Sequence, residues 1–401
     1  MHIILFDHPD QQQALLPFTF TRPVAAIRVG ILTIAEKWPY YMEGSISYAT
    51  EPHLQKKFPL SLEVGNLIIN GAVCPTDALI KTMINLPERK VLKKGNVVIG
   101  FKADREDAKA IINNKDWEPY TSIDFDGDLT IISRMVDIFR ENAQQIKADF
   151  SKITFNRTSE KIEDKHTILY APEQIFIEKG TDIRAAILNA EDGPIYIGNN
   201  AVVQEGAMIR GAFALGQGSM LTMGCRVRGD TTIGPSCKVG GEISNTIIFG
   251  NSNKAHDGFL GNAVIGEWCN LGADTNASNL KNNYGPVKLY NHQMEGFEDT
   301  GLQFCGLMMA DHSKCGINTM FNTGTVVGTS ANVYGDGFPP TFIPSFSWGG
   351  ARKITTYKLD KAVEGAQKVL ERRGLVFDAT EKEIFEIVFE KTQNQRTWEN
   401  K

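Results

Sequence analysis

Apolar residues recur at every sixth position through the central part of the chain. An unbroken series covers residues 197–239, and a later one covers residues 309–333. Between them the period shifts by two residues and resumes at Ile247, with Asn253 as an exception and Phe259 as the next member. A period of six matches neither a helix, with about 3.6 residues per turn, nor one long strand, with a period of two. It indicates a short strand and a turn in every six residues.

Small residues accompany this apolar series. The fourth residue after each apolar position is usually small, and a glycine often follows the apolar residue directly. Three such units close one triangular coil, in which the apolar residue points inward and glycine permits turn conformations that a Cβ opposes. We therefore predict a left-handed parallel β-helix of hexapeptide repeats, an exception to the usual right-handed crossover. Four cysteines occupy the small positions, where buried structural roles are expected, namely Cys225, Cys237, Cys269 and Cys315.

The segments before and after the six-residue series show different patterns of apolar residues. ILTIAEKW, NLIIN, NVVIGF and LTIISRMVDIFRENAQQI alternate strand-like and helix-like patterns, which predicts an α/β domain over residues 1–150. The polar residues 151–174 are expected to form a connector. The β-helix is expected over residues 175–338, because the cluster of prolines that follows should end it. Two amphipathic segments, TYKLDKAVEGAQKVLERR and TEKEIFEIVFEKT, predict a C-terminal extension with two helices over residues 339–401.

Charge and composition exclude several classes of partner. The chain has 42 basic and 47 acidic residues and a net charge of −5, so no basic excess is available for nucleic acid or a membrane surface. The N-terminal MHIILFDHPDQQQ lacks the pattern of a signal peptide, and no apolar run reaches the ~20 residues that span a bilayer, so we expect a cytoplasmic protein. Six cysteines without CxxC pairs predict neither a metal site nor a disulfide framework.

The apolar series is interrupted at SNKAHDGFLG and again over residues 277–302. Loops held by a rigid scaffold are common functional sites. From Ile175 to about Val333 the sequence resembles the acetyltransferase half of the GlmU-like bifunctional sugar-1-phosphate nucleotidyltransferase/glucosamine-1-phosphate N-acetyltransferases, which form UDP-N-acetylglucosamine. The motifs that carry this resemblance are NKAHDGFLGNAVIGEWCNLGADTNASNL, TGLQFCG and CGINTMFNTGTVVG.

The resemblance implies catalytic roles for His256 and Asn279. In that family the histidine takes a proton from the sugar amine as the amine attacks the thioester of acetyl-CoA, and the asparagine helps to hold the reactants. An ammonium group cannot attack, and imidazole titrates close to neutral pH, so the residue type suits the reaction. His312 occupies the same slot of its hexad without the flanking motif, and we expect it to be structural. His292 lies in the second interruption and is expected to be a solvated loop residue, with a contact to substrate as the alternative.

Recognition of a sugar phosphate needs cations, preferably a guanidinium fork. Lys288 matches a lysine of the family, whereas Ser244 and Phe259 stand where the family has a phosphate-holding lysine and a tyrosine. Solvated exterior positions are the alternative interpretation for all of the candidate cations. The expected substrate-binding residues near the histidine are Arg226, Arg228, Lys254 and Lys288.

The N-terminal part also resembles sugar nucleotidyltransferases, through LFDHPDQQQALLPFTFTRPVAAIRVG and its Thr-Arg-Pro run at Arg22. In that family a Gly-rich loop cradles the nucleotide phosphates. Here no Gly-rich loop precedes Arg22, Val24 replaces a lysine, and Ala72 in LIINGAVCP replaces a metal-binding aspartate. Arg22 and Arg28 are the candidate phosphate ligands, and Mg²⁺ is expected if this domain is active.

The resemblance implies a transferase of sugar nucleotide biosynthesis. Its β-helix would transfer an acetyl group from acetyl-CoA to an amino sugar 1-phosphate, and its N-terminal domain would use a nucleoside triphosphate; the family also implies a homotrimer. Two alternatives stay open: a nucleotidyltransferase with a purely structural β-helix, and a non-catalytic sugar-nucleotide-binding protein. A β-helix carbonic anhydrase needs a close pair of metal-binding histidines, which His256, His292 and His312 do not provide.

Overall fold

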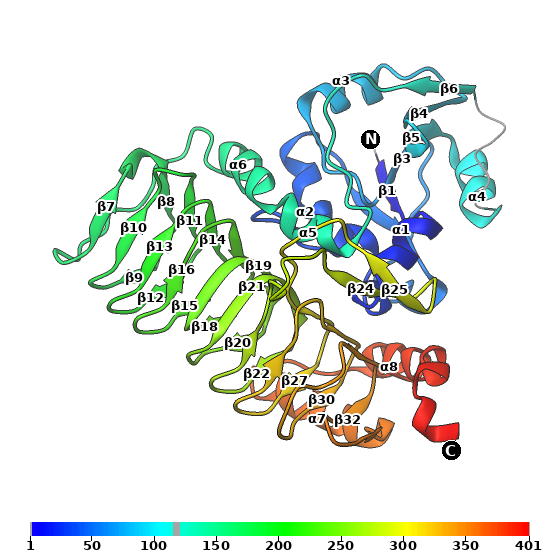
Figure 1. The fold of residues 1–401 in the computed structure, drawn as a ribbon. Coiled ribbons are helices and arrows are strands. Elements are labelled where there is room, and N and C mark those ends of the chain that lie inside the picture. The colour runs from blue at the N-terminus through cyan, green and yellow to red at the C-terminus, as the bar shows by residue number, and fades with distance from the viewer. Residues whose placement is uncertain (1, 115–120, 401) are drawn as a thin grey trace. The chain divides into compact units, whose positions relative to one another are not determined.

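A computed structural model describes residues 2–114 and 121–400 of the chain (Figure 1). The chain divides into two compact units. The first contains residues 1–15, 21–27 and 32–137. The second contains residues 16–20, 28–31 and 138–401. The division thus falls before the expected boundary at residue 150, because helix α6 (Asn142–Ile153) contacts strands of the second unit.

The first unit is built on a six-stranded sheet with the order β2-β1-β3-β5-β4-β6. β1 runs parallel to β2 and β3, whereas β5 runs antiparallel to β3. Alternate residues of β1 enter two different cores, Ile3 and Leu5 on one face and Ile4 and Phe6 on the other. A strand buried on both faces explains why HIILF is a continuous apolar run. The strands are β1 (His2–Phe6), β2 (Ile46–Ala49), β3 (Asn66–Asn70), β4 (Lys90–Lys94), β5 (Val97–Ala103) and β6 (Thr121–Asp124).

Short helices accompany this sheet. Within α4, Ala108 and Ile111 pack in the same core as Ile4 and Phe6. The helices in chain order are α1 (Pro9–Ala14), α2 (Ile34–Lys37), α3 (Asp77–Ile84), α4 (Arg105–Asn114) and α5 (Met135–Arg140), the last of which crosses the division between the units. The expected α/β class of the N-terminal part is therefore confirmed.

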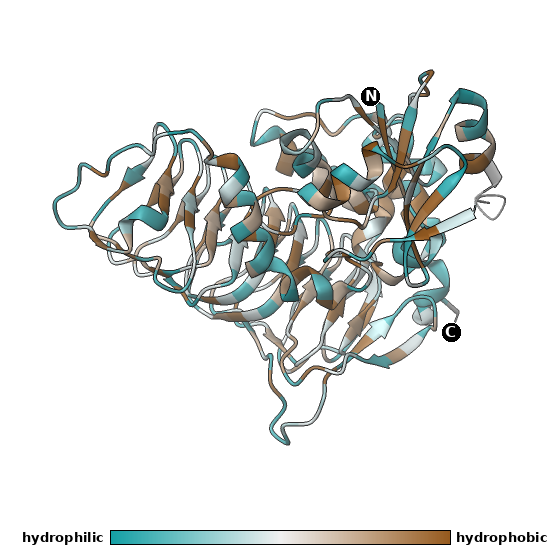
Figure 2. Cartoon of the chain, turned by 90° about the horizontal axis from the view of Figure 1, so that it is seen from above, coloured by the Kyte–Doolittle hydropathy of each residue, from teal (hydrophilic) through white to brown (hydrophobic). Residues whose placement is uncertain are grey.

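The second unit is a parallel β-helix, as the six-residue period predicts. Its short strands stack in register on three faces, and hydrophobic residues lie along the strands (Figure 2). The first face contains β7 (Ile168–Tyr170), β10 (Ile187–Asn189), β13 (Met208–Arg210), β16 (Arg226–Val227), β23 (Asn276–Ala277) and β28 (Met320–Phe321). The second face contains β8 (Ile175–Ile177), β11 (Ile195–Ile197), β14 (Phe213–Leu215), β17 (Thr231–Ile233), β26 (Met308–Met309), β29 (Val326–Val327) and β31 (Phe342–Ile343).

The third face carries one regular inward column of side chains. Its strands are β9 (Asp182–Ile183), β12 (Val202–Val203), β15 (Met220–Leu221), β18 (Lys238–Val239), β20 (Asn253–Lys254), β22 (Asn270–Leu271), β27 (Lys314–Cys315), β30 (Asn332–Val333) and β32 (Ser347–Gly349). The second residue of β9, β12, β15 and β18 is apolar and buried, as the period requires. The same register places Lys254 opposite Val239, inside the coil.

Two coils depart from the six-residue step. β19 (Glu242–Gly250) and β21 (Phe259–Glu267) are nine residues long, and each runs over both the first and the second face. Within them Ile243 and Ile248 are both core residues, so the step is five residues at this corner. The prediction that Ile247 and Phe259 point into the core is therefore wrong, because the strand continues around the corner without a separate turn. Ile248 and Leu260 enter the core instead.

The β-helix also extends beyond its expected limits. β7 pairs with β10, so the first coil begins before residue 175. At the other end, β31 and β32 pair in parallel with β29 and β30. The prolines after residue 338 lie in a loop between coils and do not end the stack, which corrects the expected end at residue 338. A hairpin of β24 (Lys288–Asn291) and β25 (Gly296–Asp299) occupies the second interruption of the series.

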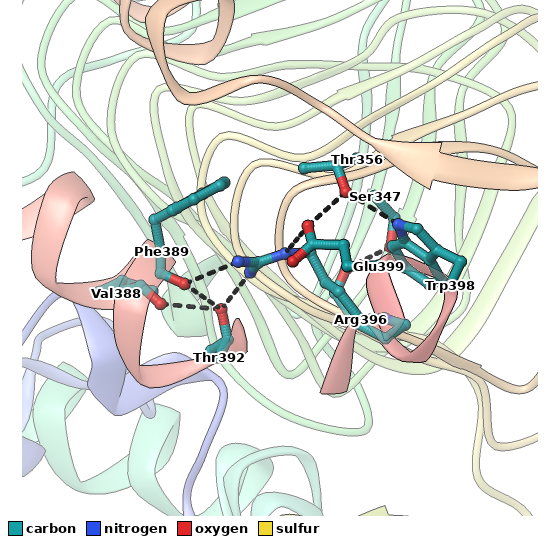
Figure 3. A network of polar contacts seen from close by, with 9 residues as sticks. Ser347, Thr356, Val388, Phe389, Thr392, Arg396, Trp398 and Glu399 are labelled. Atoms are coloured by element: carbon teal, nitrogen blue, oxygen red, sulfur yellow. Dashed lines mark hydrogen bonds and ion pairs between the residues drawn. The ribbon is translucent and has the colours of Figure 1, made fainter. Parts of the chain in front are cut away.

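The C-terminal extension contains the two expected helices, α7 (Leu359–Glu371) and α8 (Ala379–Lys391), after the antiparallel strand β33 (Ile354–Thr356). Arg396 is 0% exposed and bonds Glu399 at 2.8 Å, the Thr392 hydroxyl at 3.1 Å and the Phe389 carbonyl at 3.1 Å (Figure 3). These bonds hold the tail after α8. In the described ranges, no helix has the length and apolar character needed to cross a membrane.

Candidate functional site

His256 lies in the corner that joins β20 on the third face to β21 on the first. Its side chain is exposed, while the backbone beneath it is firmly held. Every carbonyl from residue 254 to residue 258 accepts a hydrogen bond. Gly240 N donates to the carbonyl of residue 254, Thr222 Oγ1 to that of residue 255, and Glu242 N to that of residue 258. Lys254 Nζ donates to the carbonyls of residues 256 and 257, and Asp274 N also donates to that of residue 257. The corner therefore presents an exposed imidazole on a fixed backbone.

Lys254 has a different position from the one expected. It is 1% exposed, and its ammonium donates to the carbonyl oxygens of His256 at 2.6 Å and Asp257 at 3.0 Å. Burial lowers the pKa of this ammonium, and the nearby Cys225 and the carboxylate of Asp257 oppose that shift. The expectation that Lys254 binds a substrate phosphate is wrong, because the side chain points into the coil and bonds the backbone of the corner.

Asn279 lies beside the strand that follows His256. Its side-chain nitrogen donates to Asn262 Oδ1 at 2.7 Å. A Cβ added to Gly261 would lie 2.5 Å from the Phe259 ring and 2.8 Å from Asn279 Nδ2, so both side chains lie over this glycine. The structure thus brings Asn279 together with Phe259, three residues after His256. Asn262 was not anticipated; its motif, GNAVIG, gave no signal beyond its proximity to the histidine.

Arg226 and Arg228 lie on the exterior of the first face. Arg226 is in register with Glu242, and Glu242 is in register with Phe259. With strands about 4.8 Å apart, the row from Arg226 to Phe259 spans about 10 Å. Glu242 lies between them and pairs with Arg228 at 3.0 Å and with Arg226 at 3.9 Å. Both arginines remain half-exposed or more, so they face solvent on the same face as Phe259.

The remaining cations are more widely distributed. Lys288 is exposed at the start of the β24–β25 hairpin. Arg28 is 8% exposed and donates to the carbonyls of Phe249 at 2.9 Å and Ile31 at 2.6 Å. The expectation that Arg28 binds phosphate is therefore wrong, because backbone carbonyls of its own unit hold the guanidinium. Arg22 is buried in the first unit.

In the first unit, a helix follows β1 where a Gly-rich loop would lie. α1 begins at Pro9, and the His8 ring accepts a hydrogen bond from Asp10 N at 3.3 Å. Ala72, at the position of the family aspartate, is fully buried, and its N–H donates to Asn70 Oδ1 at 3.0 Å. Asp7 lines a small cavity of about 60 Å³ and accepts hydrogen bonds from Val24 N and Thr50 Oγ1. The described residues contain no cluster of three potential metal ligands.

The two other histidines of the β-helix unit that the sequence singled out, His292 and His312, are both buried. His292 is 9% exposed, lies against the rings of Tyr290 and Phe342, and bonds Gln395 Nε2 at 3.0 Å. Burial lowers its pKa to about 4, so the expectation of a solvated loop residue is wrong. His312 is buried, stacks on Trp268 and meets Phe385 edge-on, as suits the structural role expected for it.

Comparison with known proteins relates the chain to transferases. Residues 3–158 match the family of sugar nucleotidyl transferases. The chain is 27% identical over 136 residues to the bifunctional protein GlmU of Methanocaldococcus jannaschii, covering 34% of this chain and 28% of that protein. It is 31% identical over 143 residues to the bifunctional protein GlmU of Wolbachia pipientis wMel, covering 32% of this chain and 31% of that protein. These matches confirm the resemblance to bifunctional GlmU proteins.

The aligned segments span less than a third of the length of these curated relatives. Among solved structures, an Arabidopsis UDP-N-acetylglucosamine acyltransferase is 17% identical with a TM-score of 0.25, covering 53% of this chain and 77% of that chain. The polySia-specific acetyltransferase NeuO is 13% identical with a TM-score of 0.27, covering 53% of this chain and 97% of that chain.

Proposed function

We propose that this protein is a transferase of sugar nucleotide biosynthesis whose β-helix moves an acetyl group from acetyl-CoA to the amine of an amino sugar 1-phosphate. The observation that carries the proposal is His256, an exposed imidazole on a corner whose five carbonyls are all hydrogen-bonded. The similarity to bifunctional GlmU proteins supports the same reaction.

In the proposed reaction the imidazole of His256 takes a proton from the neutral sugar amine as the amine attacks. The amine nitrogen forms a bond to the thioester carbonyl carbon, and the carbon–sulfur bond breaks. The proton passes to the leaving thiolate, which gives free coenzyme A and an N-acetylated sugar phosphate. Asn279 lies on the adjoining coil, where its amide orients the reactants through polar contacts.

For the sugar phosphate we propose Arg226 and Arg228 as ligands, with Lys288 contributing from the hairpin. Glu242 pairs with both arginines and offsets one of their two positive charges. A bound phosphate dianion would compete with this carboxylate for the guanidinium groups, which are strong partners for phosphate. We further propose that the working form is a cytoplasmic homotrimer with acetyl-CoA as the co-substrate.

The N-terminal unit supports a second candidate function. The family match of residues 3–158 favours nucleotidyl transfer from a nucleoside triphosphate with Mg²⁺, and Arg22 is the candidate phosphate ligand. Helix α1 and the buried Ala72 instead favour binding of a sugar nucleotide without turnover. Release of pyrophosphate from a sugar 1-phosphate and a nucleoside triphosphate would support transfer. Thermal stabilisation by a sugar nucleotide without pyrophosphate release would support binding alone.

The deciding experiment for the β-helix measures thiol release from acetyl-CoA in the presence of glucosamine 1-phosphate. We expect His256→Ala to lower kcat by a factor of about 10²–10⁴, the range typical of a lost general base. His166→Ala is the matched control, because His166 is an exposed histidine outside the site. Equal rates for wild type and His256→Ala would contradict the proposed role of His256, and no release from folded wild type would contradict acetyl transfer.

A further inference from the structure

Lys254 is a charged residue in an otherwise apolar or small column of the third face. Its register partner on the preceding coil is Val239, and the next coil presents Leu271. Lys254 is among the largest side chains of the protein that are fully buried. A buried ion is costly unless it has excellent partners, and replacement of buried ions by apolar residues of similar volume is often neutral or stabilising. Packing alone therefore gives no reason for a lysine here.

The partners of the ammonium explain its presence. Both belong to the corner that carries His256: the carbonyl of His256 at 2.6 Å and the carbonyl of Asp257 at 3.0 Å. Among the described residues, the His256 carbonyl accepts its hydrogen bond from Lys254 Nζ. Loss of Lys254 would leave the His256 carbonyl without this hydrogen bond, while the backbone and hydroxyl donors to the carbonyls of residues 254, 255, 257 and 258 would remain.

The preceding coil is shaped to admit this contact. Gly241 has a φ of +79°, and a Cβ there would lie 3.0 Å from Lys254 Nζ and 3.0 Å from the His256 carbonyl. The Gly240-Gly241 pair therefore leaves room in which the ammonium reaches the corner from inside the coil. The charged and titratable groups around the ammonium are Asp257, Asp274 and the thiols of Cys225 and Cys315. Burial raises the pKa of both thiols.

We propose that Lys254 is the positioning residue of His256. Its ammonium fixes the peptide of the exposed histidine from inside the β-helix and thereby sets the direction of the imidazole. The inference rests on the function proposed for His256. A displacement of about 1 Å at a reacting group lowers a rate by about 10²-fold, so a contact that fixes one peptide has a measurable effect.

Lys254→Met tests this assignment, because methionine keeps an unbranched side chain of similar size and lacks the charge. We expect the melting temperature to stay within a few degrees of wild type, kcat for acetyl transfer to fall 10- to 100-fold, and KM for the sugar phosphate to change less than threefold. Lys314→Met is the matched control. Lys314 also bonds the carbonyl of a histidine, His312, at 3.2 Å, and it lies outside the proposed site.

A second readout does not depend on activity. Asp274 N and Glu242 N donate to the carbonyls of Asp257 and Gly258, so the hydrogen exchange of these two amides reports on the corner. We expect exchange at least tenfold faster in Lys254→Met and unchanged in Lys314→Met. The double variant Lys254→Met/His256→Ala should be no slower in acetyl transfer than His256→Ala alone, because Lys254 acts through His256.

The two readouts separate the two proposals. Unchanged exchange, or an unchanged kcat in an active enzyme, would overturn the role of Lys254 and leave acetyl transfer intact. Faster exchange in a protein that transfers no acetyl group would overturn the proposed function and keep the structural role. Lys254→Leu, which restores an apolar column, is the second variant. Failure of both variants to fold would overturn the inference, because the ammonium would then be needed for the stability of the coil.

Discussion

Asn279 and Asn262 are joined by a side-chain hydrogen bond of 2.7 Å between two coils of the β-helix. Their backbones are also joined by one short segment. Cys305 N donates to the Asn279 carbonyl at 2.9 Å, and Gly306 N donates to the Asn262 carbonyl at 2.8 Å. The TGLQFCG motif therefore returns the chain from the hairpin to both asparagines, which gives a structural reason for its presence in the sequence.

Removal of the Asn279 amide should affect catalysis more than folding. Asn279 is half-buried on the surface of the coil, and its backbone bond to Cys305 does not depend on the side chain. We expect Asn279→Ala to lower kcat/KM for acetyl transfer about 10- to 100-fold with little change in melting temperature. Asn283→Ala, an exposed position in the interruption, is the control. Thiol release that is equal in both variants would remove Asn279 from the site.

Two glycines of β21 and its corner should respond differently to alanine. Gly258 has a φ of +117°, and a Cβ there would lie 2.1 Å from the carbonyl oxygen of Thr275. Because backbone cannot move aside easily, Gly258→Ala should lower the free energy of unfolding by more than about 2 kcal/mol. At Gly261 the Cβ meets the side chains of Phe259 and Asn279, so Gly261→Ala should reduce acetyl transfer with a smaller loss of stability. Denaturant unfolding and thiol release measure the two effects, and the reverse pattern would contradict the geometry.

His292 should make the protein sensitive to acid. Burial lowers its pKa from 6.5 to about 4, so the folded protein keeps the ring neutral while the unfolded chain binds a proton below pH 6.5. The stability that this group contributes is complete above pH 6.5 and is lost as the pH falls toward 4. The difference is on the order of 3 kcal/mol. We expect His292→Leu to flatten the dependence of the unfolding free energy on pH between 4 and 7, whereas the exposed control His166→Leu should leave it unchanged.

The buried guanidinium of Arg396 should be important for the C-terminal tail. Removing one partner of a buried ion pair costs about 3–5 kcal/mol. Arg396→Met should therefore lower the melting temperature and release the tail, as limited proteolysis after α8 would detect. Arg352→Met is the control, because Arg352 and Asp336 form an exposed ion pair, which is expected to contribute at most about 1 kcal/mol. Equal effects would contradict the burial of Arg396.

The sequence predicts those parts of the structure that follow from a local period. The β-helix is recognisable because the same environment recurs every six residues, and the two C-terminal helices because apolar residues recur along one face. The period fails at β19 and β21, where the steps between core residues shorten to five. The site is less predictable from the sequence, as Lys254 shows. Its place inside the coil depends on two carbonyls that only the folded corner supplies.

Other errors arise from contacts between residues far apart in the chain. Arg28 bonds the carbonyl of Phe249, and His292 bonds Gln395. No motif in the sequence marks Phe249 or Gln395 as a partner. The sequence alone therefore favours an exposed arginine and an exposed loop histidine. The flanking motif of His256, and not its burial, makes it a candidate, and its catalytic role stays a prediction.

β19 and β21 have a consequence for how the stack is assembled. Regular coils have nearly the same outline, so a coil that docks one step too early would meet a surface much like its correct partner. The nine-residue strands pair with each other from Glu242 opposite Phe259 to Gly250 opposite Glu267, across a corner that no regular coil shares. A shift of β21 by one coil would place its continuous corner against the separate strands of a regular coil, so we expect the pairing of β19 with β21 to favour one alignment of the coils on either side.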